Sequence, residues 1–334
     1  METALALPLL LPLIVVALAF DFLNGMNDAA NSIATVVSTR VLRPHHAVAW
    51  AAFFNFVAFL VFGLNVAETI GRGIVQADIV NWRVICGALF GAIIWQIITN
   101  RLGIPSSSSH ALIGGLVGAG FAKAGIDAVV WTGVFKTLAG IVLAPGLGCI
   151  IALFLMLLVS WIFVRYAPFS VDRFFRRAQF ISASLYALGH GGNDAQKTMG
   201  IIAVLLYSQG YTGTRFYVPF WVVIACQSAM ALGTLAGGWR IVKTMGSKIT
   251  RLTPMQGCCA ETGGSIMLFA ATELGIPVST THTITGSVIG VGAAKRPSAV
   301  RWTVARGIVI AWIITIPAAG VIAALFYLAV GLID

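Results

Sequence analysis

Long apolar stretches alternate with short polar segments along most of the chain. Stretches long enough to span a membrane cover residues 4–23, 47–66, 82–99, 137–164, 178–207, 217–238, 255–272 and 302–333. About 20 apolar residues are enough for an α-helix to cross a hydrocarbon core of ~30 Å. The pattern therefore predicts an all-α polytopic membrane protein.

Two polar motifs interrupt this apolar sequence, and each of them occurs twice. The tripeptide Asn-Asp-Ala at residues 27–29 returns 166 positions later at residues 193–195. A Leu-Gly-Ile-Pro segment, followed by hydroxyl residues and a histidine, covers 102–110 and returns 172 positions later at 274–282. Two motifs repeated in the same order at nearly the same spacing indicate an internal duplication of about half the chain.

The second motif predicts a re-entrant helical hairpin in each half. Pro105 and Pro277 should end an incoming helix, because proline lacks the amide donor and restricts the residue before it. Short apolar helices are expected to follow at 110–122 and 282–294. Non-helical backbone at membrane depth is tolerated only where protein or water shields it, so we expect both turns to lie inside the protein.

The first motif predicts a broken helix in each half, with breaks at Asn24-Gly25 and at residues 189–192. Each half would then hold one broken helix, one full helix, the hairpin and a second full helix. Three crossings are an odd number, so the two halves should be inverted-topology repeats. We expect a first repeat at 1–164, a cytoplasmic linker at 165–177 and a second repeat at 178–334.

Basic residues allow the orientation to be predicted. They cluster on alternate connections of this topology, at residues 40–43, 165–177, 240–251 and 295–306. Connections rich in Lys and Arg face the cytoplasm, so we expect a multi-pass protein of the cytoplasmic (inner) membrane with both termini outside.

Composition agrees with a membrane protein and excludes several other classes. The chain is 59% hydrophobic and 10% charged, with a mean hydropathy of +0.94, whereas soluble domains carry roughly 25% charged residues. The net charge of +10 lies on the connections, so it does not point to a nucleic-acid partner. The chain has no Gly-rich phosphate loop followed by Lys and Ser or Thr, and its five cysteines lack metal-type spacing, so we expect no ATPase and no cofactor.

The hydroxyl residues after each proline are candidates for anion binding. Ser and Thr are good N-caps for the short helices that follow, and a helix start offers unpaired amides and the positive end of the helix dipole. Two such starts that meet from opposite sides would surround a tetrahedral oxyanion. The candidate substrate-binding residues are Ser107, Ser108, Ser109, Ser279, Thr280 and Thr281, with Asn27 and Asn193.

The Asn-Asp motifs predict the site of a coupling ion. The carboxylates of Asp28 and Asp194, beside the amides of Asn27 and Asn193, form a donor set that suits a hard cation such as Na⁺. A desolvated carboxylate can instead carry a proton. Further candidate coupling-ion residues are Asn31 and Glu261, the latter an unpaired carboxylate inside an apolar stretch.

Three more charged residues adjoin the motifs. Lys197 lies one helical turn after Asp194, where the first half has Asn31, and it can attract the anion or pair with Asp194. Asp21 and Glu273 flank the motifs, and we expect them at the membrane interface.

Two other functions fit parts of this pattern. Ser109, His110 and Asp194 could belong to an intramembrane hydrolase, but the chain lacks the Gly-x-Ser-x-Gly elbow and its hydroxyls and carboxylates come in repeated sets. We therefore expect no enzyme. A passive anion channel would be revealed by failure to concentrate the anion against a gradient.

At these motifs the chain resembles the inorganic phosphate transporter (PiT) family, in its short bacterial form. The matching segments cover residues 25–31, 192–200, 105–110 and 277–282. The resemblance implies a secondary active symporter of inorganic phosphate driven by H⁺ or Na⁺ through alternating access. It also implies a homodimer in the lipid bilayer and a separate PhoU-like regulatory protein. Some short relatives are sulfate permeases, so sulfate is the alternative substrate.

Overall fold

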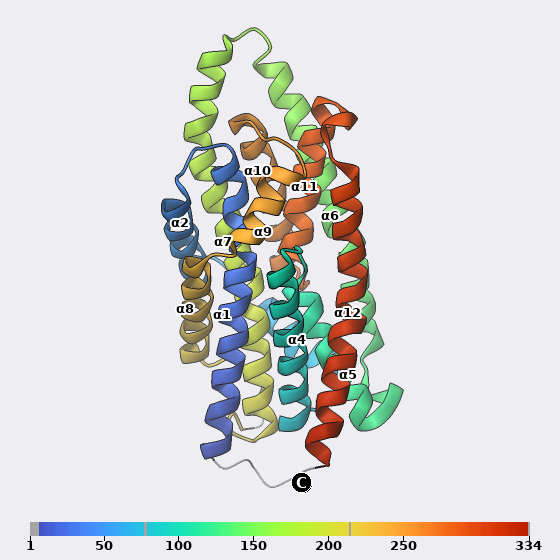
Figure 1. The fold of residues 1–334 in the computed structure, drawn as a ribbon. Helices are drawn as coiled ribbons and strands as arrows, with labels where there is room; N and C mark the ends of the chain where they lie inside the picture. Colours follow the sequence, from blue (N-terminus) through green and yellow to red (C-terminus); the bar gives the residue numbers. More distant parts are fainter. Residues whose placement is uncertain (1–6, 77–78, 214, 333–334) are drawn as a thin grey trace.

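The computed structural model describes residues 7–76, 79–213 and 215–332, and these residues form a bundle of α-helices (Figure 1). The helices of the first half are α1 (Leu7–Ser38), α2 (Pro44–Val57), α3 (Asn65–Gly73), α4 (Trp82–Leu102), α5 (Ser108–Ala124) and α6 (Trp131–Ile162). Those of the second half are α7 (Pro168–Ser208), α8 (Phe220–Ala236), α9 (Trp239–Lys243), α10 (Pro254–Glu273), α11 (Thr280–Lys295) and α12 (Trp302–Gly331). The predicted all-α fold is confirmed.

Several of these helices are suited to crossing a membrane. In the described part of the chain, 5 helices are long and apolar enough, or up to 7 if each of two bent helix pairs forms one span. The 5 are α1, α4, α5, α6 and α12. The chain is therefore a polytopic membrane protein, as the apolar pattern predicted.

Corresponding helices of the two halves run in opposite directions. In Figure 1, α1 and α6 run from the lower end of the bundle to the upper end, whereas α7 and α12 run downwards. The α4–α5 hairpin enters from the lower end and the α10–α11 hairpin from the upper end. This is the arrangement that opposite topology of the two halves requires.

The predicted breaks at the Asn-Asp motifs are wrong, because α1 and α7 are helical throughout. The glycines that suggested those breaks instead let helices pack closely. A Cβ atom at Gly25 would lie 2.1 Å from the carbonyl oxygen of Met230 on α8, and one at Gly191 would lie 2.4 Å from that of Asn55 on α2. Small residues at helix contacts allow such close approach of two backbones.

Each half does contain a broken helix, but it lies in the following span. The segments Pro44–Leu60 and Asn65–Gly73 meet at an angle of 81°, and Phe220–Ala236 meets Trp239–Lys248 at 62°. Full helices were expected at these places. The second break occurs at Gly237, whose φ of +67° is left-handed backbone that glycine adopts without strain.

A helical hairpin is present at each of the two predicted places. The incoming helices α4 and α10 are followed by Gly103 and Gly275, both with φ of +65°, before the chain reaches the prolines. A left-handed glycine is a common helix C-terminus because it satisfies the last carbonyls without a Cβ clash. The returning helices α5 and α11 begin in the middle of the bundle (Figure 1).

Each hairpin packs against a helix of the other half. On α5, a Cβ at Gly114 or Gly118 would lie 2.4 or 2.1 Å from a carbonyl oxygen of α12. The matching positions on α11, Gly286 and Gly290, approach carbonyls of α6 at 2.1 and 2.2 Å. Both hairpins are thus held by the same Gly-x-x-x-Gly contact, across the boundary between the halves.

Most of the segment expected as the linker, 165–177, is helical. Helix α6 ends at Ile162 and α7 begins at Pro168. Proline fits the first turn of a helix because its missing amide hydrogen has no partner there. Residues 168–177 are consequently the first turns of the 41-residue helix α7.

Candidate functional site

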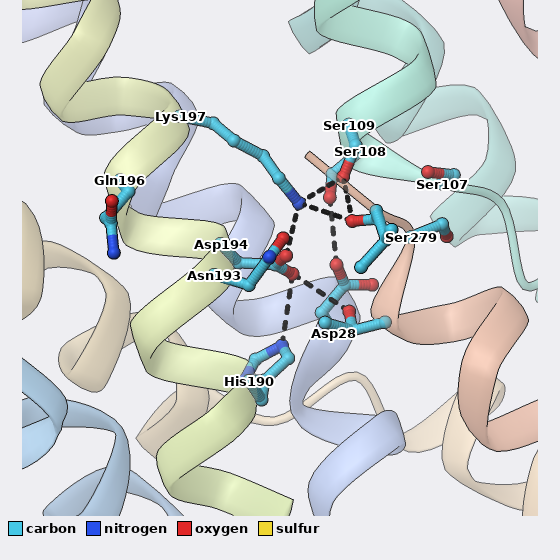
Figure 2. A network of polar contacts seen from close by, with 12 residues as sticks. Asp28, Ser107, Ser108, Ser109, His190, Asn193, Asp194, Gln196, Lys197 and Ser279 are labelled. Atoms are coloured by element: carbon cyan, nitrogen blue, oxygen red, sulfur yellow. Dashed lines mark hydrogen bonds and ion pairs between the residues drawn. The ribbon is translucent and has the colours of Figure 1, made fainter. Parts of the chain in front are cut away.

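Two carboxylates in the middle of the bundle each accept a hydrogen bond from a hairpin tip. Ser108, the first residue of α5, donates to Asp28 on α1 at 2.8 Å (Figure 2). Thr280, the first residue of α11, donates to Asp194 on α7 at 2.9 Å. All four side chains are buried. The structure therefore brings together the hydroxyl and Asn-Asp motifs, as the sequence predicted, in two equivalent pairs.

The tips themselves are the starts of helices, which explains their polar chemistry. Ser107 and Ser279 are the N-caps, and their hydroxyl oxygens accept hydrogen bonds from the backbone amides of His110 and His282 at 3.2 and 3.3 Å. The amides of the first two residues of each helix have no partner within that helix. Ser107 and Ser279 thus cap the helices, and the next residues form the surface of the site.

Lys197 reaches from α7 to the tip of the first hairpin. Its ammonium forms an ion pair with Asp194 and hydrogen bonds with the hydroxyl of Ser109 and, at 2.8 Å, the carbonyl oxygen of Val278 (Figure 2). Its side chain is 2% exposed. Of the two roles considered for Lys197, the structure shows the pairing with Asp194, and it also links α7 to both hairpins.

The second hairpin tip is held by α1 and α7. The Asn31 amide donates to the hydroxyls of Thr280 and Thr281 at 3.2 and 3.0 Å. Thr281 donates in turn to Asp28 at 3.1 Å. The hydroxyl of Tyr186 donates to the carbonyl oxygen of Thr280 at 2.9 Å. Tyr186 was not predicted from the sequence, because a tyrosine in an apolar helix gives no signal of a polar contact.

His190 is a second residue whose place in the site the sequence did not predict. Its Nε2 lies 3.3 Å from Asp194, and its Nδ1 lies 3.1 Å from the Asn55 side-chain oxygen. Asp28, His190 and Asp194 each offer one atom that could bind a metal ion, and these three atoms lie within 4.8 Å of one another. They are close enough to share a cation. The only signal was the position of His190, one helical turn before the second Asn-Asp motif.

The two motif asparagines form hydrogen bonds with the incoming arms of the hairpins. The Asn27 side chain accepts a hydrogen bond from Asn100 near the end of α4. The Asn193 amide donates to Thr272 on α10 at 3.1 Å and to the carbonyl oxygen of Ile276 at 3.3 Å. Within the described part of the chain, neither side chain forms a hydrogen bond with the Asp28 or Asp194 carboxylate. Asn27 also lines a cavity of about 170 Å³ beside α4.

Glu261 lies in a separate buried network. Its carboxylate accepts hydrogen bonds from Gln179, at 3.0 Å, and from Ser182, both on α7. Gln179 also accepts a hydrogen bond from Thr39 at 2.9 Å. The structure thus does not bring Glu261 into contact with the two motif aspartates.

One of the two flanking acids is not where it was expected. Glu273 is exposed, as predicted for the interface, but Asp21 is 0% exposed inside the bundle. Asn24 and Thr198 are its polar neighbours. Asp21 lies one turn before Asn24 on the inner face of α1, so helical periodicity would have placed it inside.

The site combines groups for an anion with groups for a cation. Two helix starts and their hydroxyls provide donors for an oxyanion. Asp28 receives hydrogen bonds only from neutral hydroxyls within the described residues, so its charge has no ammonium or guanidinium partner. A mobile cation or a proton would supply that missing charge.

Comparisons with known proteins agree with this chemistry. Residues 24–323 match the phosphate transporter family. The chain is 70% identical over 333 residues to a Rhizobium meliloti (strain 1021) protein named "Probable low-affinity inorganic phosphate transporter", and the match covers 100% of both chains. A Bacillus subtilis (strain 168) protein with the same name is 42% identical over 335 residues, again over 100% of both chains.

A solved structure has the same fold. The structure titled "The sodium-dependent phosphate transporter" matches with a TM-score of 0.90 and 25% sequence identity, covering 98% of this chain and 100% of that chain. The resemblance seen in the four motifs is confirmed, and the chain belongs to the phosphate transporter family.

Proposed function

We propose that the protein is a secondary active symporter that carries inorganic phosphate across the cytoplasmic membrane by alternating access, driven by H⁺ or Na⁺. As a member of its family the chain is a transporter and not an enzyme. The observation that carries the proposal is the pair of helix starts whose tip hydroxyls, Ser108 and Thr280, bond to the buried carboxylates Asp28 and Asp194.

Phosphate and the carboxylates would compete for the same hydroxyl protons. A serine or threonine hydroxyl has one hydrogen to donate, and Ser108 now donates it to Asp28. If Ser108 turns to an incoming phosphate oxygen, Asp28 loses a donor in a site of low dielectric, which is unfavourable for a buried charge. A cation or proton at Asp28 would offset that loss. Anion and cation would therefore bind more tightly together than apart, which is the basis of symport.

The substrate-binding groups in this proposal are the hairpin hydroxyls. Ser108, Ser109, Thr280 and Thr281 would contact phosphate directly, while Ser107 and Ser279 would keep the helix starts in place. Asn27 and Asn193 would act by holding the hairpins, because they contact α4 and the segment at the end of α10.

Alternating access would follow from the opposite directions of the two halves. We infer inverted repeats at 1–164 and 178–334, with the connecting segment on the cytoplasmic side and both termini outside. The two hairpins enter the bundle from opposite ends, so rocking of one half against the other would expose the site to each side in turn (Figure 1).

The test is uptake of radiolabelled phosphate into proteoliposomes under a pH gradient or a Na⁺ gradient, with excess unlabelled sulfate as competitor. Uphill uptake that sulfate does not reduce is the expected result, and the effective gradient identifies the ion. Both relatives reported above are named for phosphate, so the alternative of sulfate has no support from them. Uptake that only equilibrates phosphate would contradict the symporter and indicate a channel.

A further inference from the structure

The ammonium of Lys197 lies among three oxygen atoms of the kinds that bind small hard cations. They are a carboxylate oxygen of Asp194, the hydroxyl of Ser109 and the carbonyl oxygen of Val278. Carboxylate, hydroxyl and carbonyl oxygens are the usual protein ligands of hard cations. The ammonium has three hydrogens and no acceptor, so these three contacts use its full capacity.

The same oxygen atoms occur a second time at the positions related by the internal duplication. The counterparts of Asp194, Ser109 and Val278 are Asp28, Thr281 and Ser106. Ser109 donates to the Val278 carbonyl at 3.3 Å, and the hydroxyl oxygen of Thr281, which donates to Asp28, lies 3.4 Å from the Ser106 carbonyl oxygen. The two sets therefore contain the same kinds of oxygen atom, and in each set the hydroxyl lies next to the carbonyl.

The two sets differ in charge at one position. At the position of Lys197 the first half has Asn31, whose amide nitrogen donates to Thr281 at 3.0 Å. The Asn31 side-chain oxygen is buried and has no hydrogen-bond partner within the described chain. The set around Asp28 thus contains a carboxylate and an unpartnered amide oxygen, with a neutral group where the other set holds an ammonium.

We propose that the chain has two duplicated cation sites and that the Lys197 ammonium, a cation bound covalently to the chain, permanently occupies one of them. A mobile cation then binds only at the other site. That site is formed by Asp28, Thr281, Asn31 and the Ser106 carbonyl. This proposal builds on the proposed symport, because it sets how many cations each phosphate requires. It makes Lys197 a residue that determines ion stoichiometry as well as a partner of Asp194. A chain with a neutral residue at 197 would have two mobile-cation sites.

The experiment exchanges the two residues that distinguish the sets. Lys197→Asn gives the second half the residue of the first, and Asn31→Lys does the reverse. Binding of ²²Na⁺ to purified protein in lipid nanodiscs is measured without phosphate, with Lys248→Asn as a control that removes one exposed Lys. If the mobile cation is Na⁺, we expect Lys197→Asn to bind one more Na⁺ per chain than wild type, while Lys248→Asn matches wild type.

The wild-type value also identifies the mobile cation at the Asp28 set. One bound Na⁺ per chain means that this cation is Na⁺, and none means that it is a proton. Where wild type binds one Na⁺, a Lys197→Asn variant that elutes as folded protein and binds no more Na⁺ than wild type would overturn the proposal.

The reverse exchange provides an independent check, and it decides the question where Lys197→Asn does not fold or where wild type binds no Na⁺. A second tethered ammonium in the Asp28 set should abolish ion-driven phosphate accumulation in Asn31→Lys proteoliposomes. Accumulation at the wild-type level would overturn the proposal. The Na⁺ measurement does not require transport, so a wild-type protein that moves no phosphate would contradict the proposed function and leave the comparison of Na⁺ binding valid.

Discussion

Ser108 donates a hydrogen bond to Asp28 at 2.8 Å, and this contact joins the first hairpin tip to α1. Thr280 makes the equivalent contact with Asp194 on α7. The state of each carboxylate is therefore transmitted directly to a hairpin. Each hairpin also packs against a helix of the other half. A change in the charge of one carboxylate should therefore alter the contact between the two halves.

Asp28→Asn should abolish ion-driven phosphate uptake and leave the protein inserted and folded. The neutral amide removes the charge that a coupling cation needs, and the carboxylate has only neutral partners to lose. Uptake into proteoliposomes under the effective gradient measures the change. Asp172→Asn, at an exposed surface ion pair, is the control. Normal accumulation by Asp28→Asn would exclude this carboxylate from coupling.

Asp194→Asn should in addition destabilise the protein. It leaves the buried Lys197 ammonium without its counter-ion, and breaking a buried ion pair from one side costs about 3–5 kcal/mol. The apparent melting temperature should therefore fall well below that of Asp28→Asn. Equal melting temperatures for the two variants would show that Lys197 and Asp194 do not depend on each other.

Ser108→Ala or Thr280→Ala should raise the KM for phosphate and leave Vmax nearly unchanged. Each substitution removes a hydroxyl that is expected to donate to the charged anion, and hydrogen bonds to charged groups contribute about 1.5–3 kcal/mol, or roughly 10- to 150-fold in affinity. Ser160→Ala on α6 is a matched control, because among the described residues its hydroxyl bonds to the Met156 carbonyl alone. An unchanged KM in both variants would remove the hairpin tips from the phosphate site.

The sequence predicted the hairpins and the pairing of motifs because both depend on local and repeated signals. Proline after a left-handed glycine, followed by hydroxyl caps, gives the same local structure at residues 103–108 and 275–280. The helix breaks were misplaced because glycine has two uses. At Gly25 it permits close packing of α1 on α8, whereas at Gly237 it permits a left-handed bend. Sequence alone does not say which use applies, since the difference depends on the neighbouring helix.

Gly118→Val and Gly290→Val should each displace a hairpin and lower stability. The added Cβ would lie 2.1 or 2.2 Å from a backbone carbonyl oxygen, which cannot be relieved by rotating a side chain. Overpacking of this kind costs about 1–3 kcal/mol or more. Gly307→Ala on α12 is the control, because nothing lies within 4 Å of its Cβ position. A melting temperature unchanged by Gly118→Val would contradict the close contact between α5 and α12.

Glu261→Gln tests whether the separate carboxylate also takes part in ion coupling. Glu261 accepts hydrogen bonds from neutral side chains on α7, so it is a buried charge without an ammonium or guanidinium partner in the described chain. We expect Glu261→Gln to lower the phosphate accumulation reached at a fixed gradient and to leave phosphate exchange intact. This is the result that a coupling ion carried by Glu261 requires. Exchange between internal and external phosphate, measured without a gradient, separates the two effects.

Asp21→Asn should raise the stability of the protein while lowering ion-driven uptake. Asp21 is fully buried, and neither oxygen of its carboxylate has a hydrogen-bond partner in the described residues. Burying this carboxylate is unfavourable, because it must either hold a charge at low dielectric or take up a proton, and an amide of the same shape removes that penalty. Groups that reduce stability are retained mainly where function needs them. The charges of Lys197 and Asp194 act on the Asp21 carboxylate, so we expect its loss to affect ion-driven uptake. Thermal unfolding and proteoliposome uptake, each compared with the exposed carboxylate change Asp127→Asn, measure the two effects. A lower melting temperature for Asp21→Asn would mean that the carboxylate is a stabilising element of the core and would remove the reason for assigning it a role in transport.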